Sequence, residues 1–144
     1  MKIGVLALQG AFIEHVQALR QLGAEAVELR QLPDLEQPLD GIVLPGGEST
    51  VQGKLLRELG MYDALRAKIA AGLPVLATCA GMILLAEKLS NDDKVHFASM
   101  PIKVRRNAYG RQLGSFRTYA EFGALGKIPM TFIRAPYIEA VRPD

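Results

Sequence analysis

The chain has 144 residues, 49% of them hydrophobic, and a formal net charge of +2. These totals predict a single domain, residues 1–144, with a substantial core. Positive charges are spread along the chain, which argues against a nucleic-acid partner. The apolar runs are shorter than the about 18 residues that a membrane helix needs, so we expect no membrane partner. A single cysteine cannot close an internal disulfide, and we therefore expect a cytoplasmic protein.

The first 90 residues alternate between apolar runs and stretches with helical periodicity. Nearly continuous apolar runs such as KIGVLAL are typical of strands buried on both faces of a parallel sheet. The alternation predicts the α/β class, with an open, mostly parallel sheet and helices on both faces. We expect Ser49 and Thr50 to cap a helix. The predicted strands are residues 2–8, 26–30, 40–44 and 74–78, and the predicted helices are 12–22, 49–59, 62–70 and 80–89.

The pattern changes after Ser90. Residues 94–104 and 112–122 indicate strands of an irregular or antiparallel kind, and residues 129–134 indicate a further core strand. The last residues, YIEAVRPD, show no helical pattern. We therefore expect this part of the chain to depart from regular alternation of strand and helix.

Cys79 lies where a predicted strand meets a predicted helix, which is where open α/β folds bind their ligands. The stretch ATCAG, residues 77–81, resembles a nucleophile elbow, whose sharp turn needs small residues around the nucleophile. A helix beginning at Cys79 would favour the reactive thiolate, and the N–H of Ala80 would point toward an oxyanion. The alternative is a buried structural cysteine. On this stretch alone both interpretations stay open.

The block PGGEST, residues 45–50, follows another predicted strand. Its glycines allow a backbone to approach a ligand closely, and their N–H groups would complete an oxyanion hole with Ala80. Taken alone, the block fits an ordinary turn before a capped helix better. His15, on a helix face, and His96, after a polar loop, lie in contexts that do not indicate a catalytic base. One cysteine and two scattered histidines lack ligand spacing, so we expect no metal.

Five segments taken together resemble a known family. They are LALQG (6–10), LPGGEST (44–50), TCAG (78–81), RRNAYGRQ (105–112) and FIRAPYI (132–138), and they span essentially the whole chain in order. They resemble the glutaminase subunit of the pyridoxal 5′-phosphate synthase complex, a branch of the class I glutamine amidotransferases. The resemblance implies a flavodoxin-like α/β fold.

The resemblance also implies a set of site residues. Cys79 matches the nucleophile that attacks the side-chain amide of glutamine and releases ammonia. From the residues alone, the arginines fit a solvated basic face equally well, although an arginine fork suits an α-carboxylate. The matching glutamine-binding residues are Gly46, Gly47, Glu48, Arg106, Ile133 and Arg134, and the matching oxyanion-hole residues are Gly47 and Ala80.

The family passes its ammonia to a (β/α)₈-barrel synthase subunit, which builds pyridoxal 5′-phosphate from ribose 5-phosphate and glyceraldehyde 3-phosphate. The resemblance therefore implies L-glutamine as substrate, that synthase subunit as partner, and a glutaminase that is nearly idle until the partner docks. It also implies that Gln9 and Gly10 face the partner. Pyridoxal 5′-phosphate is the partner's product, so we expect no cofactor in this chain.

One feature of the family is missing from the sequence. The family carries its catalytic histidine and glutamate in a His-Pro-Glu motif, and these 144 residues contain no such motif. Losing a general base commonly lowers a rate by several powers of ten. We expect an active subunit whose C-terminal part, beyond Asp144, is absent from the sequence. The alternatives are a catalytically inactive docking subunit, if the chain ends at Asp144, and another cysteine-elbow α/β protein.

Overall fold

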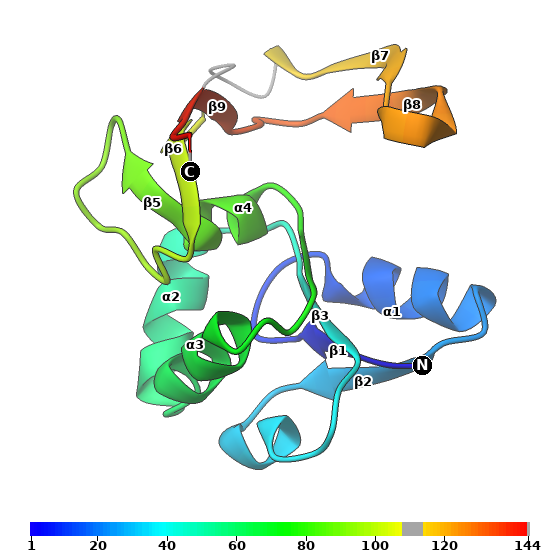
Figure 1. Ribbon diagram of the computed structural model, residues 1–144, viewed down its shortest axis with the longest axis vertical. Coiled ribbons are helices and arrows are strands. Elements are labelled where there is room, and N and C mark those ends of the chain that lie inside the picture. Colours follow the sequence, from blue (N-terminus) through cyan, green and yellow to red (C-terminus); the bar gives the residue numbers. More distant parts are fainter. Residues whose placement is uncertain (108–113, 144) are drawn as a thin grey trace.

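A parallel sheet forms the centre of the fold in the computed structural model, which describes residues 1–107 and 114–143. Its strands lie in the order β2-β1-β3-β4, and all neighbours are parallel (Figure 1). This order is the flavodoxin-like one, and it confirms the predicted α/β class. The strands are β1 (Lys2–Leu6), β2 (Glu25–Leu29), β3 (Gly41–Leu44) and β4 (Val75–Ala77).

Helices cover both faces of this sheet, as predicted. Side chains alternate along each strand, so Val5 and Val43 pack with Val16 of α1 (Phe12–Gln21) on one face. Leu6 and Leu44 point to the other face, where the remaining helices build the main core. Those elements are η1 (Leu32–Leu35), α2 (Ser49–Glu58), α3 (Tyr62–Ala70) and α4 (Ala80–Leu85).

The helix predicted over residues 80–89 is too long. Helix α4 ends at Leu85, and residues Ala86–Leu89 form strand β5 instead. These residues are good helix formers, but Ala86 is fully buried beside Ile102 and Val104 of the strand that β5 pairs with. Tertiary packing therefore overrides local helix propensity here.

A second sheet follows, with the strand order β5-β6-β9. Strand β6 (Met100–Arg105) is parallel to β5 and antiparallel to β9 (Tyr137–Val141), which was not predicted. The strand predicted over residues 94–104 is regular only from Met100 onward. Residues 94–99 form no strand because Phe97 turns into the main core, where it stacks on Tyr62.

Strands β7 (Phe116–Glu121) and β8 (Lys127–Phe132) form an antiparallel hairpin, joined through η3 (Gly123–Leu125), that extends away from the central sheet (Figure 1). The prediction of an antiparallel strand over residues 112–122 is confirmed from Phe116 on; residues 112 and 113 lie outside the described part of the chain. The strand predicted over residues 129–134 is confirmed as far as Phe132, but its assignment to the core is wrong. None of the β8 residues is buried, because β8 pairs with β7 alone.

Candidate functional site

The loops after β1, β3 and β4 meet at the carboxyl edge of the central sheet, where doubly wound folds bind ligands. The loop after β1 lies directly on the loop after β3. The N–H of Ala11 donates to the carbonyl oxygen of Gly46 over 2.9 Å. Gly10 has a φ of 98°, and a Cβ there would lie only 2.0 Å from that same oxygen. A glycine is therefore required at position 10 for the two loops to touch.

Two glutamine side chains tie these loops together. The N–H of Glu48 donates to Oε1 of Gln9 over 2.8 Å. The fully buried Gln52 donates its Nε2 to the carbonyl oxygens of Gln9 and Pro45, at 3.0 and 3.2 Å. The loop that carries Gly46, Gly47 and Glu48 is thus hydrogen-bonded both to Gln52 of α2 and to Gln9 of the loop after β1. No periodic signal in the sequence indicates this role for Gln9 or Gln52.

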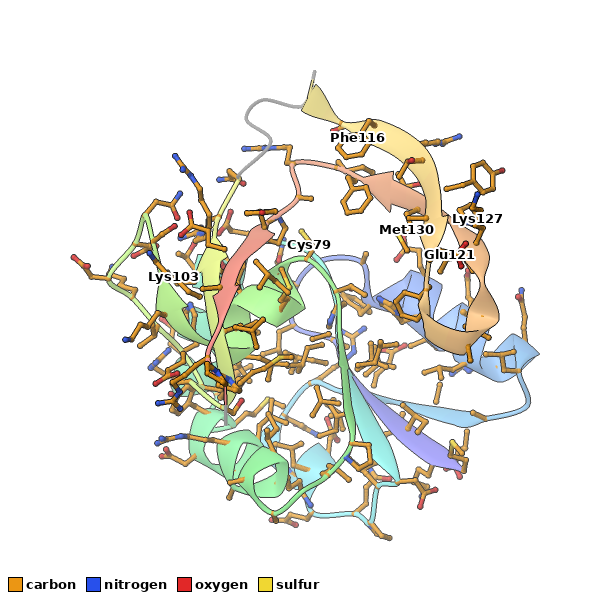
Figure 2. All side chains as sticks on the ribbon, turned by 45° about the horizontal axis from the view of Figure 1, so that its top comes forward. Cys79, Lys103, Phe116, Glu121, Lys127 and Met130 are labelled. Atoms are coloured by element: carbon orange, nitrogen blue, oxygen red, sulfur yellow. The ribbon has the colours of Figure 1, made fainter. Side chains whose placement is uncertain are left out.

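Cys79 occupies a strained turn between β4 and α4 (Figure 2). Its φ of 49° and ψ of −107° are unusual for a residue with a side chain. Gly81 makes the tight turn possible, since a Cβ at that position would lie 2.1 Å from the carbonyl oxygen of Leu44 in β3. The geometry is that of the elbow predicted from the sequence.

The backbone N–H groups of Gly47 and Ala80 both lie close enough to the Cys79 sulfur to favour its thiolate form. They come from two different loops, and they are the two donors that the sequence assigned to an oxyanion hole. Burial nevertheless raises the pKa of the Cys79 thiol; the N–H groups of Ala80 and Gly47 lower it, and the charge of Glu48 adds to the rise. The N–H of Ala80, at the start of α4, thus favours the thiolate as expected, but desolvation of the sulfur outweighs it and the net pKa is raised.

A cavity of about 700 Å³ opens beside the Cys79 sulfur. It brings together residues from segments far apart in the sequence, including the carboxyl end of the hairpin strand β8. Ala80 is 1% exposed and reaches the site through its N–H alone. Every other site residue implied by the resemblance lines the cavity: Gly46, Gly47, Glu48, Cys79, Arg106, Ile133 and Arg134.

Charges of both signs face this cavity. Glu48 accepts a hydrogen bond from Nη2 of Arg106 at 2.9 Å. Burial opposes the negative charge of Glu48, but the hydrogen bonds from Thr50 and the positive charges of Arg106 and Arg134 outweigh it and lower the pKa of the carboxyl. The cavity therefore presents one carboxylate and two guanidinium groups, an arrangement suited to a ligand with both an ammonium and a carboxylate.

The predicted cap of α2 is corrected by the same residues. Glu48 is the N-cap, and its Oε1 accepts from the N–H and the hydroxyl of Thr50, at 3.2 and 2.8 Å. Ser49 is already helical and is 2% exposed. Sequence rules favour serine or threonine as the N-cap, but here the side chain of Glu48 fills that role while it also pairs with Arg106.

Neither histidine lines the cavity of Cys79. His15 lies on α1 with its Nε2 3.3 Å from the hydroxyl of Thr78, the residue before the nucleophile. The ring of His96 packs on Gly53 of α2 and lines a separate cavity. Burial, with the positive charges of Arg57 and Arg106, lowers the pKa of His96. Within residues 1–107 and 114–143, no imidazole is therefore placed as a base for the thiol.

Two further findings concern the described residues as a whole. They contain no group of three or more His, Cys, Asp and Glu side chains arranged to hold a metal ion. They also contain no helix of sufficient length and apolarity to cross a membrane. Of the RRNAYGRQ segment, Arg106 and Asn107 line the cavity, and residues 108–112 lie outside the described part of the chain.

The sheet topology and the strained cysteine at its carboxyl edge define an α/β protein with a nucleophile elbow. A solved structure described as "Crystal structure of glutamine amidotransferase" superimposes with a TM-score of 0.90 at 43% identity, over 97% of this chain and 75% of that one. The family model for the SNO glutamine amidotransferase family matches residues 5–144. The chain belongs to that family.

Curated relatives agree with this assignment. A Desulfitobacterium hafniense protein (strain DSM 10664 / DCB-2), named pyridoxal 5′-phosphate synthase subunit PdxT, is 66% identical over 144 residues, which are 100% of this chain and 72% of that protein. A Haemophilus influenzae protein (strain PittGG) with the same name is 58% identical over 144 residues, covering 98% of this chain and 75% of its own length. The resemblance predicted from the sequence is thus confirmed at the level of the family.

Proposed function

We propose that this chain is a glutaminase that hydrolyses the side-chain amide of L-glutamine and supplies ammonia for the synthesis of pyridoxal 5′-phosphate. The observation that carries this proposal is the Cys79 sulfur, held on a strained elbow with the N–H groups of Gly47 and Ala80 directed at it. Membership of the glutamine amidotransferase family and the names of the relatives support the same activity.

The geometry supports a two-stage reaction. The Cys79 sulfur attacks the amide carbon, and the developing oxyanion accepts hydrogen bonds from the N–H groups of Gly47 and Ala80, which lie near the sulfur. The carbon–nitrogen bond breaks, the nitrogen leaves as ammonia with the thiol proton, and a thioester remains. Water then attacks the thioester, which releases glutamate and returns the proton to the sulfur. Removing one oxyanion donor typically lowers kcat by about 10²–10³-fold.

Charge explains why the substrate is a free amino acid. In this proposal the α-carboxylate of glutamine takes the guanidinium groups of Arg106 and Arg134, and its α-ammonium takes Glu48. Gly46 and Ile133 line the same cavity and leave room for the side chain of the substrate. A peptide-bound glutamine carries neither of the two charged groups, so the cavity favours the free amino acid.

We further propose that residues 1–144 form a single glutaminase domain and that its base lies outside them. The raised pKa of the Cys79 thiol means that a base must remove its proton, and neither His15 nor His96 lines the cavity. This chain covers 72% of the Desulfitobacterium hafniense relative and 75% of the Haemophilus influenzae relative, so both relatives are longer than the region that matches this chain. In the proposed enzyme a histidine outside residues 1–144 completes the site.

The proposed partner is a barrel-shaped pyridoxal 5′-phosphate synthase subunit, and the relatives carry the name of that synthase. Gln9 and Gly10 are proposed as partner-facing positions, because they touch the loop that carries the oxyanion donor and Gly10 is exposed. We place the enzyme in the cytoplasm, where the single cysteine stays a thiol. Nucleic acid and membrane have no part in the proposed activity.

The test is ammonia release from glutamine by the protein mixed with the synthase subunit. We expect Cys79→Ala to abolish release while the two subunits still form a complex in analytical ultracentrifugation. Full ammonia release by Cys79→Ala would remove this residue from the role of nucleophile. Complex formation by the unsubstituted protein without any ammonia release would instead identify a docking subunit that lacks activity.

A further inference from the structure

The loop of residues 90–95, between β5 and β6, makes two hydrogen bonds to the main chain of Arg106. The side-chain amide of Asn91 donates from Nδ2 to the carbonyl oxygen of Arg106 over 2.9 Å. Oδ1 of the same side chain accepts from the N–H of Arg106 over 3.0 Å. This double pairing is the one that a neighbouring strand would give, but Arg106 follows the last residue of β6 and Asn91 supplies it instead.

Asp92 holds the other end of the same residue. Its Oδ2 accepts a hydrogen bond from Nη1 of Arg106, whose Nη2 donates to Glu48 over 2.9 Å. The N–H of Lys94 donates to Oδ1 of Asp92 over 2.9 Å and keeps this carboxylate in place. The Arg106 side chain is only 16% exposed. Two carboxylates from different loops therefore hold both ends of one guanidinium at the cavity wall.

We propose that Asn91 and Asp92 are positioning residues that hold Arg106 in the orientation that receives the α-carboxylate of glutamine. This inference rests on the proposed function. An unrestrained arginine samples many rotamers, and binding then has to select one of them. A guanidinium already fixed at the cavity wall binds without that loss, which is the general advantage of a preorganised site.

The sign of the effect separates positioning from simple electrostatics. Asp92 is a negative charge close to the place where a substrate carboxylate would lie, so it repels that carboxylate. If charge alone mattered, removing Asp92 would tighten glutamine binding. If Asp92 positions Arg106, removing it weakens binding despite the lost repulsion. The two accounts predict changes in opposite directions.

The experiment measures glutamine hydrolysis by the complex with the synthase subunit. We expect Asp92→Ala to raise the KM for glutamine about tenfold with kcat nearly unchanged, because an interaction made equally in ground and transition states is lost. Asp92→Asn removes the same charge but keeps an oxygen acceptor. Its KM should therefore lie between those of the unsubstituted protein and of Asp92→Ala. Asp93→Ala, a change of the exposed neighbour on the same loop, is the matched control and should leave KM unchanged.

Two further variants keep the result interpretable. Asn91→Ala should also raise KM, and it provides an independent test if the Asp92 variants unfold, which thermal unfolding would reveal. In an Arg106→Ala background, Asp92→Ala should no longer raise KM, since its positioning action passes through Arg106. An unchanged or lowered KM in Asp92→Ala, or an equal rise in Asp93→Ala, would overturn the inference. No glutamine turnover by the unsubstituted complex would instead refute the proposed function, and the positioning role with it.

Discussion

Replacing Gly81 with alanine should destabilise the protein and displace Cys79. The new Cβ would lie 2.1 Å from the carbonyl oxygen of Leu44, where such contacts are not shorter than 3.0 Å in real structures. That oxygen belongs to the central strand β3, which is fully buried at Leu44, and it already accepts a hydrogen bond from the N–H of Thr78 over 3.1 Å. Neither the new Cβ nor the carbonyl oxygen of Leu44 belongs to a flexible side chain that could turn aside. Helix α4 therefore has to move away from the sheet.

The size of the effect follows from opposing contributions. Alanine is favoured over glycine inside a helix by about 1 kcal/mol. Overpacking a closely packed contact costs about 1–3 kcal/mol, and loss of the Thr78 hydrogen bond adds about 1 kcal/mol. The free energy of unfolding should therefore fall by about 1–3 kcal/mol, out of about 5–15 kcal/mol for a typical domain. Because Cys79 lies two residues before Gly81, the same shift separates the sulfur from its backbone donors.

Urea unfolding and the rate of Cys79 alkylation by iodoacetamide test this prediction together. Gly23→Ala is the control: Gly23 has a φ of 80°, and a Cβ added there would meet no atom within 4 Å, so its variant suffers backbone strain alone. We expect that control to lose stability without any change in Cys79 alkylation. A Gly81→Ala protein with unchanged stability and an unchanged alkylation rate would show that the close approach of α4 to β3 is not needed.

Three other predictions concern neighbouring parts of the site. Gly53→Ala should lower the free energy of unfolding, because its Cβ would lie 2.2 Å from the His96 ring. In a His96→Ala background the same substitution should be neutral or stabilising, and urea unfolding of the single and double variants measures the difference. The alkylation rate of Cys79 should rise at higher pH than that of free cysteine, because burial raises the pKa of the thiol, and Glu48→Gln should move the rise to lower pH by removing a negative charge. Arg106→Ala should raise the KM for glutamine in the complex, and an unchanged KM would remove this arginine from the substrate site.

Local sequence signals predicted the central sheet and most of its helices. The prediction of a helix over residues 62–70 coincides with α3, because glycines at 60 and 72 flank the segment and its pattern is local. The four parallel strands were found from short apolar runs, since burial on both faces requires them. The segments around Gly47 and Cys79 could be found for the same reason, since each lies immediately after one of these strands and beside glycines. Arg106 and Arg134 follow β6 and β8, and the sequence indicated them only through the family resemblance.

Structural features that depend on residues distant in the sequence could not be predicted. Residues 86–89 have good helix propensity but become β5, because β6 offers a pairing partner and a shared apolar cluster. Strand β9 consists of exposed residues and exists through its pairing with β6. The roles of Asn91 and Asp92 are invisible in a short polar loop, since the residue that they hold is 14 or 15 positions away.

The sequence by itself therefore determined the α/β class, the elbow around Cys79 and the family, because these rest on short-range patterns of apolar, small and glycine residues. Only the tertiary structure decided the direction in which the pKa of the thiol shifts and which charged side chains pair with one another. Burial of the sulfur outweighs the effect of the helix start on the thiol pKa, and Glu48, Asp92 and Arg106 meet from three separate segments. Desolvation and Coulomb interactions depend on distances through space, and a linear pattern of residues does not contain those distances.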